Sequence, residues 1–267
     1  MHRAVTPDGV RRIILEQSKR ANKGHIGSAL SAADLLAALY GGALRIPSPR
    51  DPDRDRFILA KGHAALALYA ALRLRGFITE EQLNTFCGDG TLLGVHPDAA
   101  LPGVDFSTGS LGQGLPQGAG CALAARLQGS GRRVFVLASD AECDEGSLWE
   151  AVMFAAQHQL ANLVVIVDVN GQQALGRTRD ILDLSPLARR WEAFGWDARE
   201  VDGHDAALLR GTIDSLATQG RGAPHALLAK TTFGHGVSFM ENQLKWHYWP
   251  MSDEEHRLAM AEIGRLQ

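Results

Sequence analysis

The chain is poor in cysteine, in long apolar runs and in net charge of either sign. Its 267 residues include only Cys87, Cys121 and Cys143, an odd number without the spacing of a zinc site. This scarcity excludes a disulfide framework and favours a reducing, cytoplasmic location. No apolar run reaches the roughly 20 residues of a membrane-spanning helix, and the polar start of the chain is unlike a secretory signal.

The charge balance and composition narrow the class of protein. A formal net charge of −3 offers no electrostatic reason to expect binding to nucleic acid or to an anionic membrane. A hydrophobic content of 45% and a charged content of 21% are those of an ordinary globular protein. The length suits one large domain or two small ones, with a sizeable buried core.

Apolar runs and helical patterns alternate along the chain. We expect strands at 56–60, 134–138, 163–167, 198–201 and 226–229. We expect helices at 6–20, 31–44, 112–127, 146–156, 205–217 and 252–267, the second one starting at a capping box from Ser31 to Asp34. This alternation predicts a three-layer α/β/α fold with a mainly parallel sheet.

Two oxygen-bearing side chains directly follow neighbouring strands of this pattern. Asp140 comes after the run 134–138, and Asn170 comes after the run 163–167, with a helix between them. The carboxyl ends of parallel strands meet at one edge of the sheet, where open α/β sheets bind ligands. A carboxylate and an amide oxygen suit a hard divalent cation that also holds phosphate oxygens. The segment therefore favours a site for a metal–diphosphate cofactor.

A purely structural interpretation of the same segment stays open at this point. Asp140 could cap the following helix, and Asn170 could form a turn with Gly171. A Gly-Asp-Gly sequence at 88–90 is not a second candidate for a metal loop, because it follows a helical pattern instead of a strand. We expect it to be a surface turn.

Four histidines lie at the ends of elements, mostly beside glycine or proline: His25, His63, His96 and His247. Imidazoles bind phosphate and hydroxyl groups and transfer protons near neutral pH. One such histidine is more often structural, but four in loops favour a functional role. The glycine-rich segment 109–114 precedes a helix, so its backbone can approach a ligand closely.

Taken together, these segments resemble the thiamine diphosphate-binding, N-terminal half of transketolase. The resemblance runs in one order through almost the whole chain, over 24–28, 55–63, 94–97, 107–114, 140–150, 166–176, 202–205 and 236–241. The last two segments, with 245–247, are most similar to transketolases encoded as two separate subunits.

The resemblance implies a role for each matching residue. Asp140 and Asn170, with the backbone carbonyl of Gln172, match the ligands of Mg²⁺ or Ca²⁺. His63 and His247 match histidines that contact the cofactor diphosphate. His25 and His96, together with His247, match residues that face the substrate. Gly109 and Leu111 match residues that contact the aminopyrimidine, and Ala141 matches a residue whose backbone N–H approaches the diphosphate. Glu145 and Glu150 match acids at an interface between paired sites, and Glu145 also lies by the cofactor.

The chain departs from the family pattern at two places. The usual Gly-Asp-Gly becomes Ser139-Asp140-Ala141, and a positive φ at Ala141 would penalise its Cβ and weaken cofactor binding. The segment 233–236 lacks the lysines that commonly flank its glycine in two-subunit relatives. We expect this loss of positive charge to change the substrate or the affinity for the diphosphate.

The function that the resemblance implies is that of the cofactor-binding subunit of a split transketolase. It would transfer a two-carbon ketol unit from a phosphorylated ketose to an aldehyde. Residues 1–267 would form a single diphosphate-binding domain, with the pyrimidine-binding domain on a separate, C-terminal-type subunit in an α2β2 heterotetramer. Such a chain would be inactive alone, because the glutamate that activates the cofactor comes from the pyrimidine-binding half.

Three alternatives stay open. One is the α subunit of a 2-oxo acid dehydrogenase, against which the four histidines argue. Another is transfer of the two-carbon unit to a lipoyl or carrier-protein acceptor in a specialised pathway. The third is a non-catalytic scaffold with weakened cofactor binding, suggested by Ser139 and Ala141.

Overall fold

The centre of the fold is a five-stranded sheet in which every neighbouring pair of strands is parallel. The computed structural model describes residues 4–216 and 222–264, and the strand order is β1-β2-β3-β7-β6. The strands are β1 (Arg56–Leu59), β2 (Val134–Ser139), β3 (Leu163–Val169), β6 (Asp197–Asp202) and β7 (His225–Lys230). All five predicted strands are confirmed.

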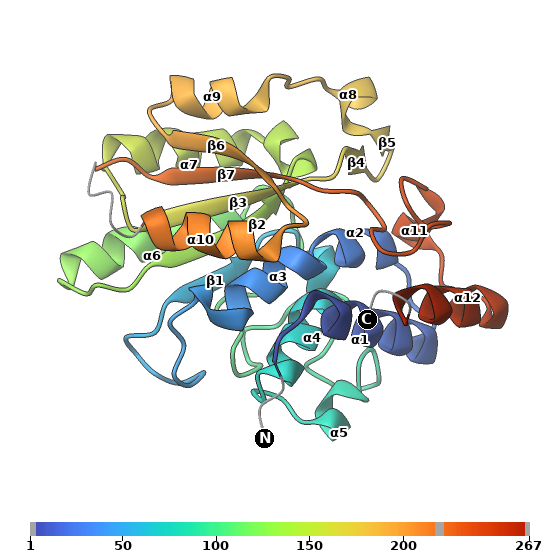
Figure 1. Cartoon of the computed structure of the whole chain (residues 1–267). Coiled ribbons are helices and arrows are strands. Elements are labelled where there is room, and N and C mark those ends of the chain that lie inside the picture. The colour runs from blue at the N-terminus through green and yellow to red at the C-terminus, as the bar shows by residue number, and fades with distance from the viewer. Residues whose placement is uncertain (1–3, 217–221, 265–267) are drawn as a thin grey trace.

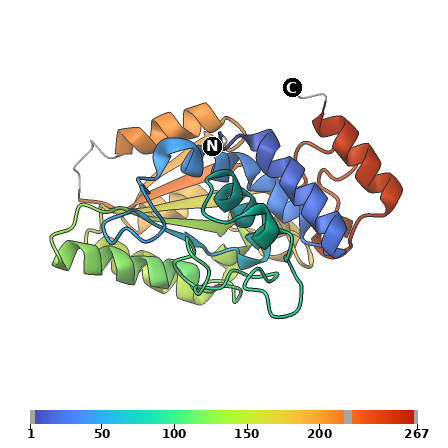
Figure 2. The ribbon, with the colours of Figure 1, turned by 90° about the horizontal axis from the view of Figure 1, so that it is seen from below.

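Helices cover both faces of the sheet and make three layers (Figures 1 and 2). Along β2, Phe135 and Leu137 point into one core while Val134 and Val136 point into the other. The first core is closed by α1 (Pro7–Ala21), α3 (Ala33–Ala38), α4 (Ala65–Leu74) and α10 (Ala206–Leu216), and the second by α6 (Gly114–Leu127), α7 (Gly146–Gln157) and α9 (Leu187–Ala193). Burial on both faces explains why these strands are continuous apolar runs. The predicted α/β/α fold is confirmed.

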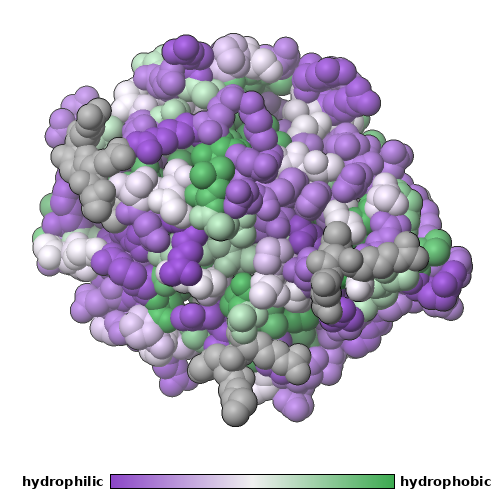
Figure 3. All heavy atoms as spheres, viewed as in Figure 1, coloured by the Kyte–Doolittle hydropathy of each residue, from purple (hydrophilic) through white to green (hydrophobic). Residues whose placement is uncertain are grey.

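Shorter elements connect these layers and form the edge where the strands end. They are α2 (Ile26–Ser31), η1 (Leu39–Ala43), η2 (Gly62–Ala64), α5 (Glu80–Leu83), η3 (Ala141–Asp144), α8 (Thr178–Ile181), α11 (Lys245–Tyr248), α12 (Asp253–Ile263) and the small antiparallel pair β4 (Gln172–Gln173) and β5 (Gly176–Arg177). Across residues 4–216 and 222–264, no helix is long and apolar enough to cross a membrane. The face in Figure 3 is mostly hydrophilic, with hydrophobic residues in small separate recesses.

The helix predicted at 31–44 is confirmed in part, because residues 33–38 form α3 and residues 39–43 continue as η1, but the capping box is wrong. Ser31 ends α2, and its hydroxyl donates to the buried carboxylate of Asp168 at 2.6 Å instead of capping the next helix. Hydrogen bonds to an ionised group are stronger than those to a neutral amide, so the carboxylate takes the hydroxyl. Asp34 pairs with Arg11 of α1.

Other predicted boundaries change only slightly. The helix predicted at 112–127 begins at Gly114, and the turn at 88–90 is exposed as expected. The predicted ends of two helices, at 217 and at 265–267, lie outside the described residues.

Gly24 lies where two segments from opposite ends of the chain meet. A Cβ at this position would lie 2.2 Å from the carbonyl oxygen of Tyr248. We expect Gly24→Ala to push the segment around Tyr248 away and to lower the free energy of unfolding by about 1–3 kcal/mol. Gly120→Ala is the matched control, because no atom lies within 4 Å of its added Cβ on α6. Urea denaturation of both variants checks this, and a fully stable Gly24→Ala would contradict the close approach.

Candidate active site

Most of the residues predicted for the site line one cavity at the carboxyl edge of the sheet. The cavity has a volume of ≈ 320 Å³. Its lining includes His25, His63, Gly109, Leu111, Ala141, Glu145, Asn170, Gln172 and His247. Asp140 does not line it but lies buried directly behind it, between Ser139 and Ala141. Glu150 is exposed on α7 and does not line this cavity.

The Asp140 carboxylate ties together the two loops that leave β2 and β3. One oxygen accepts a hydrogen bond from the Ala141 backbone at 3.0 Å. The other accepts from the Gly171 backbone at 2.8 Å and from the Thr178 hydroxyl at 3.3 Å. Asp140 therefore starts the short turn η3 and does not cap the predicted helix, because the N-cap of α7 is Glu145.

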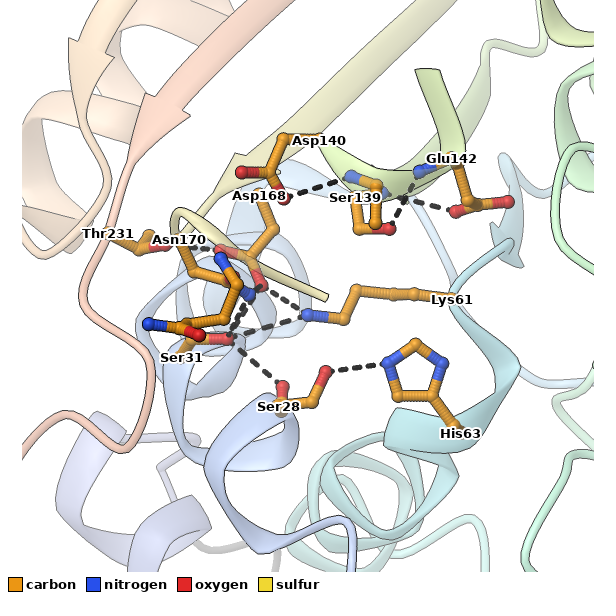
Figure 4. A network of polar contacts seen from close by, with 12 residues as sticks. Ser28, Ser31, Lys61, His63, Ser139, Asp140, Glu142, Asp168, Asn170 and Thr231 are labelled. Atoms are coloured by element: carbon orange, nitrogen blue, oxygen red, sulfur yellow. Dashed lines mark hydrogen bonds and ion pairs between the residues drawn. The ribbon is translucent and has the colours of Figure 1, made fainter. Parts of the chain in front are cut away.

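The amide of Asn170 also makes a local turn. Its Oδ1 accepts from the backbone N–H of Gln172 at 3.0 Å. Its Nδ2 donates to Asp168 and to Ser31, each at 3.3 Å. Figure 4 shows Asp140 and Asn170 on either side of Asp168.

These residues can hold a cation in addition to their structural bonds. A carboxylate offers about four lone-pair sites and an amide oxygen two. Asp140 uses three of these sites, and Asn170 Oδ1 uses one, so each retains acceptor capacity. The donor set is composed of hard oxygens, as Mg²⁺ and Ca²⁺ require. The structural and the metal-binding interpretations are thus compatible.

The local electrostatics favour arrival of a positive charge. Burial and, to a smaller extent, the neighbouring Asp168 raise the pKa of Asp140 to about 7, against the lowering effect of its backbone hydrogen bonds and of Lys61. A divalent cation at this edge would restore the ionised form.

Three imidazoles form a triangle on the opposite wall of the cavity. The ring centroids of His25 and His63 are 5.7 Å apart, those of His25 and His247 are 5.4 Å apart, and those of His63 and His247 are 5.6 Å apart. His63 is oriented by Ser28, whose Oγ lies 2.8 Å from its Nε2. Segments from three distant parts of the chain therefore converge on one spot.

The three imidazoles are neutral at physiological pH, and two of them have an unused polar atom. Burial lowers the pKa of His25 and of His63, and it lowers that of His247 to about 4, with smaller contributions from neighbouring histidines and, for His63 and His247, from Lys61. The Nδ1 atoms of His25 and His247 are buried without a hydrogen-bond partner among the described residues. Such atoms are costly unless a ligand pairs with them. The site is therefore built for a polar ligand.

His25 has a left-handed backbone with φ of 60°, uncommon for a residue other than glycine. Its backbone N–H donates to the carbonyl of His247 at 3.2 Å, which fixes the two rings relative to each other. His96 is exposed and lies beside Gly109, where an added Cβ would be 3.1 Å from its ring. It stands at the rim of the site and does not line the cavity.

The expected strain at Ala141 is wrong. Ala141 begins the short helical turn η3 and does not have a positive φ. Its backbone N–H, which the family pattern directs to the diphosphate, donates to Asp140. The methyl group at this position therefore carries no conformational penalty.

Glu142 is a site residue that sequence reasoning missed. Its carboxylate accepts from the backbone N–H of Gly112 at 3.0 Å and of Ser139 at 3.1 Å. The Ser139 hydroxyl accepts from the backbone of Glu142 at 3.2 Å in return. Ser139-x-x-Glu142 has the pattern of a capping box, which could have revealed this pairing. Ser139 thus gains a structural role that glycine could not fill.

A cluster of Asp34, His204 and His235 is close enough to hold a metal, but its hydrogen bonds exclude one. His204 Nδ1 lies 2.8 Å from Asp34, and His204 Nε2 accepts from the backbone of Thr232 at 2.8 Å. Asp34 also forms an ion pair with Arg11. Both ring nitrogens of His204 are therefore occupied, and the cluster anchors the segment that carries His235.

A carboxylate and an amide at the carboxyl edge of a parallel sheet, in the same site as neutral imidazoles, define an α/β domain with a polar ligand site where open sheets of this kind bind ligands. Residues 3–265 match the family described as "Transketolase, thiamine diphosphate binding domain". The chain belongs to this family, and the predicted resemblance and the thiamine diphosphate cofactor are confirmed.

Several relatives that match along almost the full length of the chain are components of split enzymes. One component of the apulose-4-phosphate transketolase of Phocaeicola vulgatus is 38% identical over 95% of this chain and 91% of its own length. One component of a 6-deoxy-6-sulfo-D-fructose transketolase from a Clostridium species is 38% identical over 96% and 94%. The predicted class, the cofactor-binding subunit of a split transketolase, is confirmed by these matches.

Undivided transketolases match over a smaller share of their length. Human transketolase is 37% identical over 97% of this chain but only 41% of its own. The crystal structure of the Campylobacter jejuni enzyme superimposes with a TM-score of 0.90 at 28% identity, covering 97% of this chain and 42% of that one. The chain thus spans about two fifths of the length of these undivided relatives.

The low pKa of His247 predicts how stability depends on pH. Its pKa is about 4 in the folded protein and near 6.5 unfolded, so the unfolded chain binds more protons between these values. The stabilisation from neutral His247 is complete above pH 6.5 and is lost as the pH falls towards 4. Between neutral pH and about pH 4, the free energy of unfolding of His247→Gln should therefore fall by up to about 3 kcal/mol less than that of the parent.

Urea denaturation of the parent and of His247→Gln at several pH values measures the difference between their free energies of unfolding. The opposite contributions of Asp140 and Glu142, both with a pKa raised to about 7, are shared by parent and variant and cancel. A stability difference that does not change with pH would show that the His247 pKa is normal.

Proposed function

We propose that this chain supplies the cofactor and cation site of a two-component transketolase that moves a two-carbon ketol unit from a phosphorylated ketose to an aldehyde. The observation that carries the proposal is the cavity that Asn170 lines together with the triangle of His25, His63 and His247, with the Asp140 carboxylate buried directly behind it. The cation is Mg²⁺, or Ca²⁺ in its place. When bound, thiamine diphosphate supplies the carbon nucleophile and the electron sink for cleavage beside the ketose carbonyl.

The chain's own residues bind and orient. Asp140, Asn170 and the carbonyl of Gln172 would hold the cation, which would supply positive charge for the diphosphate. Neutral His63 and His247 would donate hydrogen bonds to the diphosphate, and Ser28 fixes the ring of His63 for this. Because the rings are neutral, they bind through oriented N–H groups and not through net charge.

A second set of residues would face the organic parts of the ligands. Gly109 and Leu111 line the cavity beside Glu145 and would contact the aminopyrimidine. His25, with His247, would bind substrate hydroxyls and hold or move a proton at Nδ1, the atom that has no hydrogen-bond partner among the described residues. His96, at the rim, would meet the substrate as it enters.

A partner subunit is part of the proposal. Three relatives that this chain matches over more than nine tenths of their length are each named as one of the subunits of a transketolase, which implies a second chain in those enzymes. Beside the cavity, Leu175 is 74% exposed and Trp249 is 64% exposed, so an apolar rim is available to a covering chain. We infer that a pyrimidine-binding subunit covers this rim in an α2β2 assembly, that Glu150 lies at an interface, and that residues 1–267 act as one domain.

The substrate class follows from the relatives and from the neutral imidazoles. Two relatives act, by name, on apulose-4-phosphate, and a third on a sulfonated fructose. An anionic ketose is therefore our proposed donor. Its phosphate would be held mainly outside this chain, since the cavity is lined by no Lys or Arg from the described part of the chain. The three cysteines are free, which suits the cytoplasmic location that we propose.

Loss of a cation ligand should weaken cofactor binding strongly. Asp140→Ala is expected to weaken the affinity for thiamine diphosphate in the presence of Mg²⁺ by more than about 100-fold, and Asn170→Ala by about 10- to 100-fold. Isothermal titration calorimetry measures both. Asp89→Ala is the matched control, because it changes a Gly-Asp-Gly aspartate in an exposed turn. Unchanged affinity in both site variants would remove the site assignment and favour a scaffold.

Activity should require a second chain. The purified chain is expected to transfer no ketol unit, and addition of its cognate pyrimidine-binding subunit should produce turnover with phosphorylated ketose donors. A coupled assay for the released aldose measures this, and Asp140→Ala mixed with the same partner is the negative control. Robust turnover by the rigorously purified chain alone would refute the two-component proposal.

A further inference from the structure

Lys61 is a fully buried lysine that the proposed chemistry does not use. It follows β1, its side chain is 0% exposed, and it forms an ion pair with Asp168, which is also 0% exposed (Figure 4). Burying an ion pair costs several kcal/mol per ion, often more than the pair returns. An ion pair that contributes little to stability needs a functional explanation. The position of Lys61 and Asp168 beside the candidate cation ligands suggests such an explanation.

Asp168 lies between the two side chains that would hold the cation. Its backbone carbonyl accepts from the backbone N–H of Asp140 at 3.1 Å. Its Oδ2 accepts from the Nδ2 of Asn170 at 3.3 Å. The hydroxyl of Thr231 donates to Oδ1, and that of Ser31 donates to Oδ2 at 2.6 Å. One buried residue therefore contacts both candidate ligands and is itself held from several sides.

This arrangement determines which way the Asn170 amide faces. Its NH₂ group is directed at two acceptors, Asp168 Oδ2 and Ser31 Oγ. A flipped amide would place its oxygen against the Asp168 carboxylate, where two acceptors would repel. The amide oxygen must therefore face the opposite way, towards the loop at Gln172.

Lys61 determines what the Asp168 carboxylate can do. Without a counterion, the Asp168 carboxylate would either repel the Asp140 carboxylate or compete with it for the cation. Nζ of Lys61 lies against Oδ2 of Asp168 and 3.4 Å from the Ser31 hydroxyl. The lysine thus keeps Asp168 as a paired anion that accepts from Asn170.

We propose that Asp168 is a positioning residue that orients the amide oxygen of Asn170 towards the cation, and that Lys61 is the counterion that reserves Asp168 for this task. The inference rests on the proposed function, because it assumes that Asn170 is a cation ligand. Outer-sphere hydrogen bonds of this kind typically change metal affinity by about 10- to 100-fold.

A double-mutant cycle on the full chain tests the inference. Thiamine diphosphate is titrated calorimetrically at saturating Mg²⁺ into the parent, Asp168→Asn, Asn170→Ala and the double variant. We expect Asp168→Asn to weaken binding by about 10- to 100-fold in the parent and by less than about twofold in the Asn170→Ala background, since its effect passes through Asn170. Lys61→Met should follow the same pattern.

Two further variants separate positioning from a general loss of structure. Asp55→Asn changes an equally buried carboxylate, 0% exposed and paired with Arg45 and Arg133, at the opposite edge of the sheet. It should lower stability in urea but leave cofactor affinity unchanged. Ser31→Ala removes one of the two acceptors of the Asn170 amide and should weaken cofactor binding about threefold to tenfold. This variant tests the inference if Asp168→Asn does not fold.

The outcomes distinguish the two proposals. Unchanged binding in both Asn170→Ala and Asp140→Ala, or no binding by the parent, overturns the cation site and this inference with it. Weakened binding in Asn170→Ala but unchanged binding in Asp168→Asn and Ser31→Ala overturns the inference alone. Additive losses of affinity in the double variant would show that Asp168 acts independently of Asn170, which also overturns the inference. An equal loss of affinity in Asp55→Asn would show a general structural effect and would overturn the inference as well.

Discussion

The parallel pairing of β2 with β3 is the interaction on which the rest of the site depends. Ser139 pairs with Asp168 in this register, so the chain leaves both strands at the same level. Asp140 and Asn170 follow within two residues, on adjacent loops. A shift of one residue in this register would turn every side chain to the other face and separate them. The same edge receives Thr231, which follows β7 and donates its backbone N–H to Val169 at 3.2 Å.

Periodicity was sufficient to predict the sheet and the placement of Asp140 and Asn170 at one edge of it. The five strands are short apolar runs between turn signals, and burial on both faces leaves them little alternative. His25, His63 and His247 could be placed in one site only through the family resemblance, because no local pattern shows that distant loops converge. The predictions that failed concerned side-chain hydrogen bonds. The capping box at Ser31 was wrong because a carboxylate more than a hundred residues away took its hydroxyl.

Ala141 and Glu142 show a related limit. A substitution of glycine suggested strain, yet the backbone conformation depends on the turn that Ser139 and Glu142 form together. The conformation of one residue was inferred from its identity, whereas it is determined by its neighbours. The role of Lys61 could not be predicted either, since nothing in the local sequence distinguishes a buried lysine from a solvated one.

Burial gives the cavity an electrostatic balance that ligands would change together. Low-dielectric surroundings favour neutral histidines and raise the pKa of Asp140 and Glu142 to about 7. A cation alone or an anion alone would enter with an unfavourable desolvation cost. A cation and a diphosphate entering together largely neutralise each other. This coupling explains why buried carboxylates behind the cavity and imidazoles that line it belong to one site.

The position of β7 affects the order in which the chain can fold. It is the last of the five sheet strands along the chain, yet it lies inside the sheet, between β3 and β6. During synthesis, the edges of β3 and β6 therefore stay unpaired until residues 225–230 leave the ribosome. Unpaired edges of apolar strands promote aggregation. A nascent chain of this protein thus exposes the unpaired edge of the apolar strand β3 in the interval between the synthesis of residues 163–169 and that of residues 225–230, and a chaperone that shields this edge would act in that interval.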